Sequence, residues 1–409
     1  MTDKNFYIAD LHIHSSYSRA TARGMTPRIL AETAKQKGVS LLGTGDIFHP
    51  DWREELERSL EEKGRGIYHL DGVDFILTGE LSFIYQKRGA VRKVHMVYAL
   101  PLFRDAEKLA RGMGQHNLRS DGRPILGEDA AEFTKYILDT VPDAMIIPAH
   151  IWTPWFSLFG SNSGFNTVTE AFGPLADHIT ALETGLSSDP PMNWRVSELD
   201  RFSLVSNSDA HSPDRIGREA NVFSGPLDYY QLKEVLEKKD RNRFLFTVEL
   251  YPEEGKYHYD GHRNCKVIFH PRQTKEHAGM CPVCGKPLTI GVLSRVEELA
   301  DRPEGERPSS AIDYRSLIPL REIIGDVMGT SPASKAVDRI HAKLVAGLGS
   351  EMNVLLNASQ DEIARSSDPD VAKGVMAARQ GDVDIIPGHD GEYGKISLRI
   401  KRGEVGSLF

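Results

Sequence analysis

The first 240 residues alternate short apolar runs with amphipathic stretches, and this alternation constrains the fold more than any other feature of the sequence. Short apolar runs are typical of buried strands, and the stretches between them have the spacing of the helices that cover a sheet. Strands that alternate with helices predict a parallel sheet, and this many repeats favours an α/β barrel. The predicted strands span residues 6–14, 39–46, 75–85, 93–100, 144–150, 180–184 and 203–209.

The first predicted helix has recognisable ends. Thr26 can cap it, Pro27 suits its first turn and Gly38 suits its exit. Further helices are expected over residues 51–63 and 128–140, with a hairpin turn at residues 86–92.

The pattern changes after residue 240. Residues 241–300 are rich in His, Pro and Gly and hold all three cysteines, and the charged, Pro-containing stretch that follows them reads as a linker. The remainder is mainly helical and ends in a basic strand at residues 395–402. We therefore expect a barrel at residues 1–240, a zinc-binding lobe at 241–300 and a mainly helical C-terminal region at 301–409.

Composition excludes several classes of protein. The 409-residue chain is 40% hydrophobic and 26% charged, which is typical of globular domains and not of coiled coils or disordered chains. It has no apolar run long enough to cross a membrane, and its charged N-terminus does not resemble a signal peptide. Three cysteines fit a reducing cytosol, so we expect a cytoplasmic protein. The net charge of -8 argues only weakly against a nucleic-acid partner, because bound metal ions would add positive charge.

The segment Asp10-Leu-His12-Ile-His14 ends the first predicted strand. Alternate residues of a strand share a face, so Asp10, His12 and His14 are expected to point together. Neutral imidazoles on one edge are typical metal ligands. A polar edge strand would give the same short pattern.

Other strand ends repeat this residue chemistry. In an α/β barrel the carboxyl ends of the strands meet at one mouth, so acids and histidines there can form one metal site. A lone residue of this kind is more often a solvated acid or a hydrogen-bonded histidine, but chance explains the whole set poorly. The candidates are Asp46, Glu80, His95, His150, Glu183, Asp209 and His211.

The motifs DLHIHSSYS, TGD, GE, AH and SDAH resemble those of the polymerase-and-histidinol-phosphatase (PHP) superfamily over about residues 6–240. The resemblance implies a distorted (β/α)7 barrel with two or three divalent ions, Zn²⁺, Mn²⁺ or Mg²⁺. It implies one site from His12, His14, Glu80 and Asp209, a second from Glu80, His95 and His150, and contributions of Asp46 and His211 to a third, with Glu183 an additional ligand. The chain departs from the pattern at Ala20, where many members have His, and at Asp46, which replaces another His.

Such a centre predicts phosphoester hydrolysis. Adjacent divalent ions activate water and stabilise an in-line displacement at phosphorus. The sequence has no Gly-rich phosphate loop and no GxSxG elbow that would indicate other chemistry. Cationic side chains near the mouth can bind a phosphate or can equally be surface residues. The expected catalytic residues are Asp209, Glu80, His211, Arg19 and Arg195, and Lys93 is expected to contact the substrate.

A second motif predicts a structural zinc site. His262-Arg-Asn-Cys265 and, after fifteen intervening residues, Cys281-Pro-Val-Cys284 together supply four ligands for a tetrahedral site. Four protein ligands leave no open position for catalysis, so the ion would hold a small lobe together. The alternatives are a redox CxxC pair or unrelated thiols, and neighbouring histidines compete for the fourth position.

Residues 151–164 leave the strand end at His150 and carry four large aromatic side chains. Exposed aromatics beside a phosphodiesterase centre can stack on a base, although large apolar side chains are more often buried. We expect Trp152, Trp155, Ser161 and Asn162 to line a substrate pocket.

The order of a PHP barrel followed by YHYDGHRNC and CPVCGKPLTIGVLSRVEELADRP resembles the endonuclease Q family of DNA-repair nucleases. That resemblance implies DNA as the partner, with hydrolysis on the 5′ side of deaminated bases (uracil, hypoxanthine, xanthine) and of abasic sites. A small-molecule phosphatase of the histidinol-phosphate type and a non-catalytic DNA-binding module are the alternatives. A sliding clamp is a further partner class considered for a repair nuclease, but no QxxLxxFF-type motif in the sequence supports it.

Overall fold

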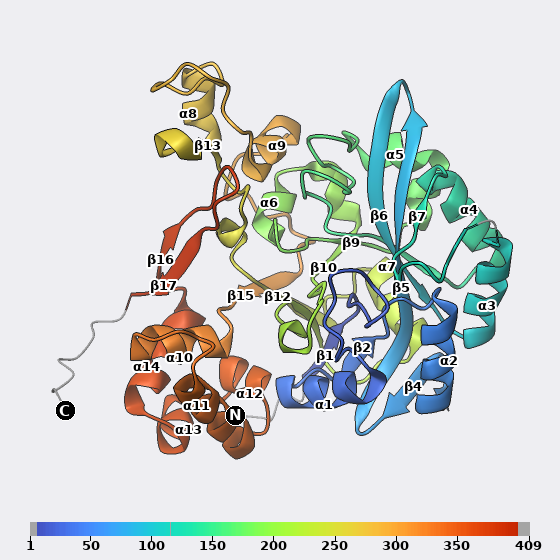
Figure 1. Ribbon diagram of the computed structural model, residues 1–409, viewed down its shortest axis with the longest axis horizontal. Helices are drawn as coiled ribbons and strands as arrows, with labels where there is room; N and C mark the ends of the chain where they lie inside the picture. The colour runs from blue at the N-terminus through green and yellow to red at the C-terminus, as the bar shows by residue number, and fades with distance from the viewer. Residues whose placement is uncertain (1–5, 115, 400–409) are drawn as a thin grey trace.

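The computed structural model describes residues 6–114 and 116–399. Within them a strongly curved 11-stranded sheet occupies one half of the molecule (Figure 1). Its main path runs in the order β15, β12, β11, β1, β2, β5, β4, β3, with β6 joining β5 to β8 and β7 added to β5. The strands are β1 (Tyr7–Asp10), β2 (Leu41–Gly43), β3 (Glu61–Gly64), β4 (Ile67–Leu70), β5 (Val73–Lys87), β6 (Ala90–Leu100), β7 (Ile125–Leu126), β8 (Met145–Pro148), β11 (Ala220–Phe223), β12 (Phe244–Glu249) and β15 (Asp313–Ser316).

Helices cover the outside of this sheet, and a parallel pair, β9 (Ala181–Glu183) and β10 (Ser203–Val205), continues it beyond β8. The first helix begins and ends where the sequence predicts, with Thr26 at its N-cap and Gly38 in the left-handed conformation at its end. The helices of this half are α1 (Pro27–Lys37), α2 (Pro50–Ser59), α3 (Phe103–Gly112), α4 (Ala130–Thr140), α5 (Val168–Phe172), α6 (Pro190–Trp194) and α7 (Tyr229–Glu237). The distorted α/β barrel predicted from the sequence is confirmed.

The sheet is mixed: the parallel pairs expected from the sequence are present, and so is the hairpin expected at residues 86–92. The β1–β2 and β2–β5 pairs are parallel, but β5 and β6 form a long antiparallel hairpin and β8 pairs antiparallel to β6. The reason is the tight turn at Arg88 and Gly89, which both have positive φ, because strands joined by so short a turn can pair only antiparallel. The predicted helix at 51–63 also ends early, at Ser59, since residues 61–64 pair with β4 instead.

The large sheet continues past residue 240. Strand β12 lies between β11 and β15, so the expected boundary at residue 240 cuts the sheet. The lobe that follows contains β13 (Asp260–His262), β14 (Val267–Phe269), α8 (Pro271–Glu276) and α9 (Val292–Leu299). The C-terminal region is mainly helical, as predicted, with α10 (Leu320–Met328), α11 (Lys335–Leu348), α12 (Glu351–Leu356), α13 (Gln360–Ser366), α14 (Pro369–Gln380) and a hairpin of β16 (Val383–Ile386) and β17 (Lys395–Leu398). Residues 400–402 of the predicted basic strand lie outside the described residues.

Two apolar clusters fix the strand ends in place. One fills the barrel with side chains contributed by successive strands, including Leu11, Leu41, Ile76, Val97 and Ile147. The other packs the outer strand faces against the helices. Because the interior is a packed core, polar side chains can gather only at its mouth.

Candidate metal centre at the barrel mouth

Histidines and acids on or just after five strands meet at the mouth of the barrel. His12 and His14 follow β1, and His150 and Asp209 follow β8 and β10. Glu80 and His95 lie on the paired strands β5 and β6, where Glu80 is opposite Val97 and His95 is opposite Ser82. His150 and Asp209 have positive φ, as does Asp46 after β2. Positive φ is costly for residues other than glycine and concentrates at functional sites. The chain bends sharply at these positions, and this turns their side chains toward the mouth.

The first cluster consists of His12, His14 and Asp209, whose ligand atoms all lie within 4.8 Å of one another. Asp209 Oδ1 is 3.0 Å from His14 Nε2 and 3.7 Å from His12 Nε2. Both imidazoles are almost completely buried, whereas the Asp209 side chain is 25% exposed. Asp209 therefore marks the side of the cluster that a substrate can reach.

The second cluster consists of Glu80, His95 and His150. Glu80 Oε1 is 2.7 Å from His95 Nδ1 and 3.2 Å from His150 Nε2. The other oxygen of Glu80, Oε2, faces the first cluster and lies 3.4 Å from His14 Nε2. A single buried carboxylate thus touches both clusters, which is the geometry of a group that bridges two cations.

The donor set fits divalent metal ions. His12 Nε2 is buried and has no hydrogen-bond partner among the described residues, so a cation that displaces its proton can bind this nitrogen. Imidazole nitrogens with carboxylate oxygens suit Zn²⁺ and Mn²⁺ and do not exclude Mg²⁺. The two ligand clusters support the expectation that the barrel holds divalent ions, and they do not define how many ions bind or which metal they are.

The pKa shifts describe the same charge arrangement. Burial opposes a charge on His12, but the carboxylates of Glu183 and Glu80 outweigh it and raise the pKa of His12 well above its usual value. Burial likewise opposes ionisation of Glu80, and His95 and Arg123 outweigh it and hold the pKa of Glu80 well below its usual range. Burial lowers the pKa of His95 to about 4. A proton on His12 therefore balances the carboxylates here, whereas His95 stays neutral, and cation binding would release the His12 proton.

Asp46 and Glu183 hold the imidazoles rather than join the clusters. Asp46 Oδ1 accepts from His14 Nδ1 at 3.0 Å, and its Oδ2 accepts from the Ser15 N–H and from the hydroxyls of Ser15 and Ser18. Glu183 accepts from His12 Nδ1 at 3.0 Å and from Asn207.

The sequence predicts both acids as metal ligands, but the structure gives their oxygens to other partners. The physical reason is that a ligating histidine needs an acceptor on its second nitrogen, which fixes the tautomer and aims Nε2 at the ion. Asp10 is separate as well, since it accepts from the N–H groups of Ser208 and Gly217. The strand ends at Asp10, so the alternation that placed it beside His12 stops there.

His211 lies at the rim of the first cluster. Its ring centroid is 4.4 Å from that of His14, and its Nδ1–H donates to the Asp209 carbonyl oxygen. The side chain is 30% exposed and leaves Nε2 on the open side. Burial and the neighbouring His14 lower the pKa of His211, so this nitrogen is unprotonated at neutral pH.

Arg123 is the functional candidate that sequence reasoning missed. Its Nη1 donates to Glu80 Oε2 at 2.9 Å, and its pKa is raised because Glu80 outweighs burial. The loop that carries it is held against the site, since a Cβ on Gly122 would lie 2.3 Å from Asp46 Oδ2. This segment has no periodic pattern, so only the spacing of charges could have drawn attention to it. The predicted Arg19 lies on the same side but is largely exposed and pairs with Asp121.

The aromatic segment after His150 divides into buried and exposed parts. Trp152 is buried, and its Nε1 donates to Asn193. Trp155 is 48% exposed, and Phe156 places its ring 4.7 Å from that of His95. Lys93 lies over the Phe156 ring, and Ser161 and Asn162 are exposed.

Two predicted contacts are therefore not at the site. Trp152 serves the core because its ring packs on Phe159. Arg195 donates to Glu297 and to the carbonyl of Arg302, which joins the barrel to the lobe and the segment after it. The polar groups of Trp152 and Arg195 are engaged in these contacts, so we do not include either residue in the proposed substrate site.

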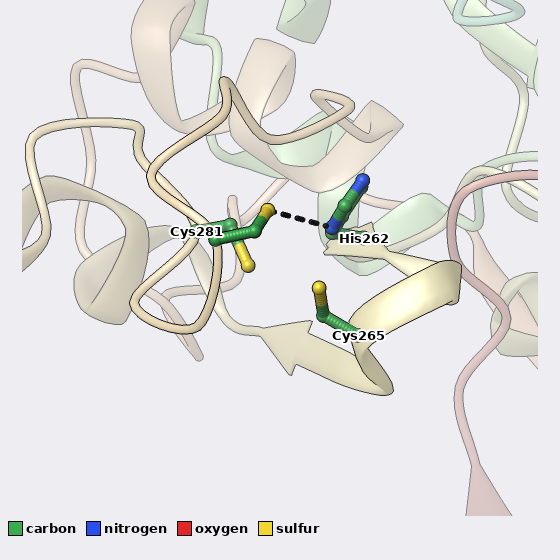
Figure 2. A group of neighbouring side chains, drawn as sticks. His262, Cys265 and Cys281 are labelled. Carbon is green, nitrogen blue, oxygen red and sulfur yellow. Dashed lines mark hydrogen bonds between the residues drawn. The ribbon is translucent and has the colours of Figure 1, made fainter.

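The predicted zinc ligands of the lobe meet at one point. His262, Cys265, Cys281 and Cys284 place their ligand atoms within 4.8 Å of one another, and Figure 2 shows the three labelled side chains pointing to a common centre. Burial disfavours the Cys281 thiolate, but the N–H groups of Cys284 and Val283 outweigh it and lower the pKa of Cys281 to about 6. The cluster fits a closed, structural zinc site. The apolar core of this lobe is small and centres on Val267, Cys281 and Leu288.

Fold and site together define a PHP-type α/β protein with a candidate multi-metal hydrolytic centre and a separate zinc lobe. A lesion-specific endonuclease Q from Pyrococcus furiosus has a similar structure, with 33% identity, a TM-score of 0.86 and 99% of each chain covered. Endonuclease Q in complex with a 27-mer duplex that has an abasic lesion at the active site matches with a TM-score of 0.84 and 33% identity, over 99% of this chain and 100% of that one.

Two curated proteins are also similar to this chain. YqxK of Bacillus subtilis, an uncharacterised protein, is 32% identical over 95% of this chain and 98% of its own length. The uncharacterised MJ0043 of Methanocaldococcus jannaschii is 36% identical over 62% of this chain but only 32% of that longer protein. Residues 319–382 match the family model of the MJ0043 C-terminal domain. The chain belongs to the endonuclease Q family. This confirms that it is a hydrolase of the endonuclease class. No helix among the described residues is long and apolar enough to span a membrane.

Proposed function

We propose that this protein is a metal-dependent DNA-repair endonuclease that hydrolyses the phosphodiester on the 5′ side of deaminated bases (uracil, hypoxanthine, xanthine) and of abasic sites. The observation that carries the proposal is the match, over 99% of this chain, to an endonuclease Q whose active site holds an abasic lesion in duplex DNA. The position of Glu80 between two ligand clusters at the barrel mouth supports it.

The proposed ligands are His12, His14 and Asp209 for one cation and His95 and His150 for a second, with Glu80 shared between them. Cations there would supply the charge that stabilises an in-line displacement at phosphorus and would acidify the attacking water. His211 can add its unprotonated Nε2, as a ligand or as a proton acceptor, on the open side of Asp209.

Arg123 is proposed to bind the scissile phosphate. It pairs with Glu80 Oε2, the oxygen that faces the first cluster, and its side chain is 27% exposed. When Glu80 shares its charge with cations, the guanidinium is freed to donate to a phosphate oxygen, which Arg does with two parallel hydrogen bonds.

The lesion strand is proposed to lie along the segment that follows His150. Trp155 offers an exposed ring, Ser161 and Asn162 offer hydrogen-bonding groups, and Lys93 offers a positive charge beside Phe156. An enzyme that recognises a damaged base holds it outside the stack, where aromatic and polar groups can contact it. Arg19 is exposed and remains a proposed backbone contact.

The test uses the full-length protein with Mn²⁺ or Mg²⁺ and three substrates. A labelled duplex with one deoxyuridine, deoxyinosine or abasic site should receive a single nick 5′ to the lesion, and an undamaged duplex should stay intact. Phosphate release from histidinol phosphate without any nick would replace the proposal by the phosphatase alternative. Binding to the lesion duplex without turnover at any metal concentration would replace it by the DNA-binding alternative.

A further inference from the structure

A surface groove of about 430 Å³ lies between the edge of the large sheet and the C-terminal helices. The residues on one side come from β15, which pairs only with β12 and so forms the edge of the sheet, and those on the other come from α12 and α14 (Figure 1). Ligand sites are frequent at such junctions, and this volume is within their usual range. The groove is lined by Tyr251, Tyr314, Arg315, Ser316, Leu317, Leu355, Leu356, Arg379, Gln380 and Gly381.

The charge in this groove is positive and unbalanced. Two arginines line it, and no carboxylate is among the lining residues of the described chain. Two acids that neighbour the lining residues in sequence have partners of their own, since Asp313 pairs with Arg307 at 3.0 Å and Asp382 pairs with Arg399 at 3.5 Å. The chain as a whole has more acids (58) than basic residues (50), so a groove whose charged lining residues are all arginines stands out from the rest of the molecule.

Both guanidinium groups are held in place with donors to spare. Arg315 lies over the ring of Phe246 at 4.0 Å, and no hydrogen bond or ion pair of its guanidinium is found within the described residues. Arg379 donates through Nε and Nη2 to the carbonyls of Leu355 and Val354, so its Nη1 is available to donate to a ligand. Groups fixed before a ligand arrives lose little entropy on binding it. Burial and the nearby Arg315 lower the pKa of Arg379, so the two guanidinium groups influence each other across the groove.

We infer that the Arg315–Arg379 groove binds the phosphate group of a nucleotide, with Tyr251 and Tyr314 beside its apolar part. Arg is the residue best suited to phosphate, and the Tyr and Ser316 hydroxyls add further hydrogen-bonding groups. The phosphate comes from one of two sources, a free nucleotide or the backbone of a DNA strand outside the cleavage site. For the DNA source the inference rests on the proposed function, and for a free nucleotide it does not.

The experiment measures binding to the full-length zinc-loaded protein by titration calorimetry, with dAMP and with a short undamaged duplex as probes. Arg315→Gln should weaken the affinity for at least one probe by roughly tenfold, the loss of one charge-assisted contact. Arg339→Gln removes the same charge from an exposed position on α11 and should leave both affinities unchanged. Ser316→Glu places a carboxylate in the groove and should repeat the effect of Arg315→Gln, so the test does not depend on Arg379, whose loss could unfold α12.

The probes identify the source. Weakening for dAMP alone assigns a free nucleotide, weakening for the duplex alone assigns backbone phosphate, and weakening for both assigns the phosphate that they share. Unchanged affinities in folded Arg315→Gln and Ser316→Glu overturn the inference, and so does an equal loss in Arg339→Gln. Nicking of a lesion duplex is measured in parallel. If the wild type does not nick the lesion duplex, the proposed function is wrong, but the dAMP titration still tests the groove.

Discussion

Nη1 of Arg123 lies 2.9 Å from Oε2 of Glu80, the carboxylate that touches both ligand clusters. This contact places a cation from an irregular loop at the same oxygen that would face a metal ion. A guanidinium and a divalent cation repel each other, so the pair must loosen as the ions bind. Arg123 is then a cationic side chain at the mouth that can donate to a phosphate.

Replacing Arg123 by Gln tests its role. The nicking rate should fall by a factor on the order of 10² to 10³, because a positioned donor to transition-state charge is lost. The metal content of the protein, measured by mass spectrometry, should stay the same. Arg119→Gln on the same loop is the matched control, since Arg119 pairs with Asp51 away from the clusters. Full activity in Arg123→Gln, or loss of its metal, would contradict a phosphate-binding role.

Asp46→Asn separates a positioning residue from a ligand. Asn tolerates the left-handed backbone of this position but cannot hold His14 Nδ1–H as strongly. Metal affinity should fall by roughly 10- to 100-fold with the same number of ions bound at saturation. A chelator competition titration measures both quantities, with Asp139→Asn on the exposed face of α4 as the control. A lower number of ions at saturation would show that Asp46 is a ligand after all.

The ion pair between Lys37 and Glu351 joins the barrel to the C-terminal helices, and we expect acid to weaken it. Burial opposes ionisation of Glu351, but Lys37 at 2.8 Å and His341 outweigh this and lower the pKa of Glu351 to about 2. Because the pKa of Glu351 is lower in the folded state than its value near 4.3 in the unfolded chain, its ionised form stabilises the fold above about pH 4.3. This stabilisation is lost as the pH falls toward 2. The contribution at neutral pH is on the order of 3 kcal/mol.

The free energy of unfolding of the wild type should therefore drop between about pH 4.5 and pH 2, and Glu351→Gln should be less stable at pH 7 and flatter over that range. Denaturant titration at a series of pH values measures this. Equal slopes for the two proteins would show that the ion pair contributes nothing.

Zinc removal should unfold the lobe and spare the barrel. The apolar core of the lobe is small, so four ligands around one ion supply much of its stability. In Cys281→Ser, hydrogen exchange over residues 258–291 should become fast while that of the barrel strands stays slow. Met280→Ala, an exposed neighbour, is the control. Slow exchange in Cys281→Ser with zinc still bound would refute the ligand assignment.

The sequence predicts the parts of this site that follow the period of a strand. His12, His14, Glu80, His95, His150 and Asp209 all stand at or near ends of apolar runs, and all six reach the mouth. The exact role of a carboxylate was not predictable, because Asp46 and Glu183 differ from Glu80 only in which hydrogen-bond donors the fold brings to them.

Other features depend on tertiary packing alone. Arg123 sits in a loop without a pattern, and it reaches Glu80 only because that loop is held against Asp46. The burial of Trp152 and the exposure of Trp155 follow from the path of one irregular segment, which no periodicity specifies. The antiparallel pairing of β5 with β6 follows from the hairpin turn that the sequence predicts at residues 86–92.

The most direct measurement maps the position of the nick on a duplex with a single abasic site, and compares the wild type with Glu80→Gln in the presence of Mn²⁺. The account predicts one metal-dependent nick on the 5′ side of the lesion in the wild type and none in Glu80→Gln, although the variant still binds the duplex. A nick of unchanged rate in Glu80→Gln, or one that persists after all divalent ions are chelated, would contradict it.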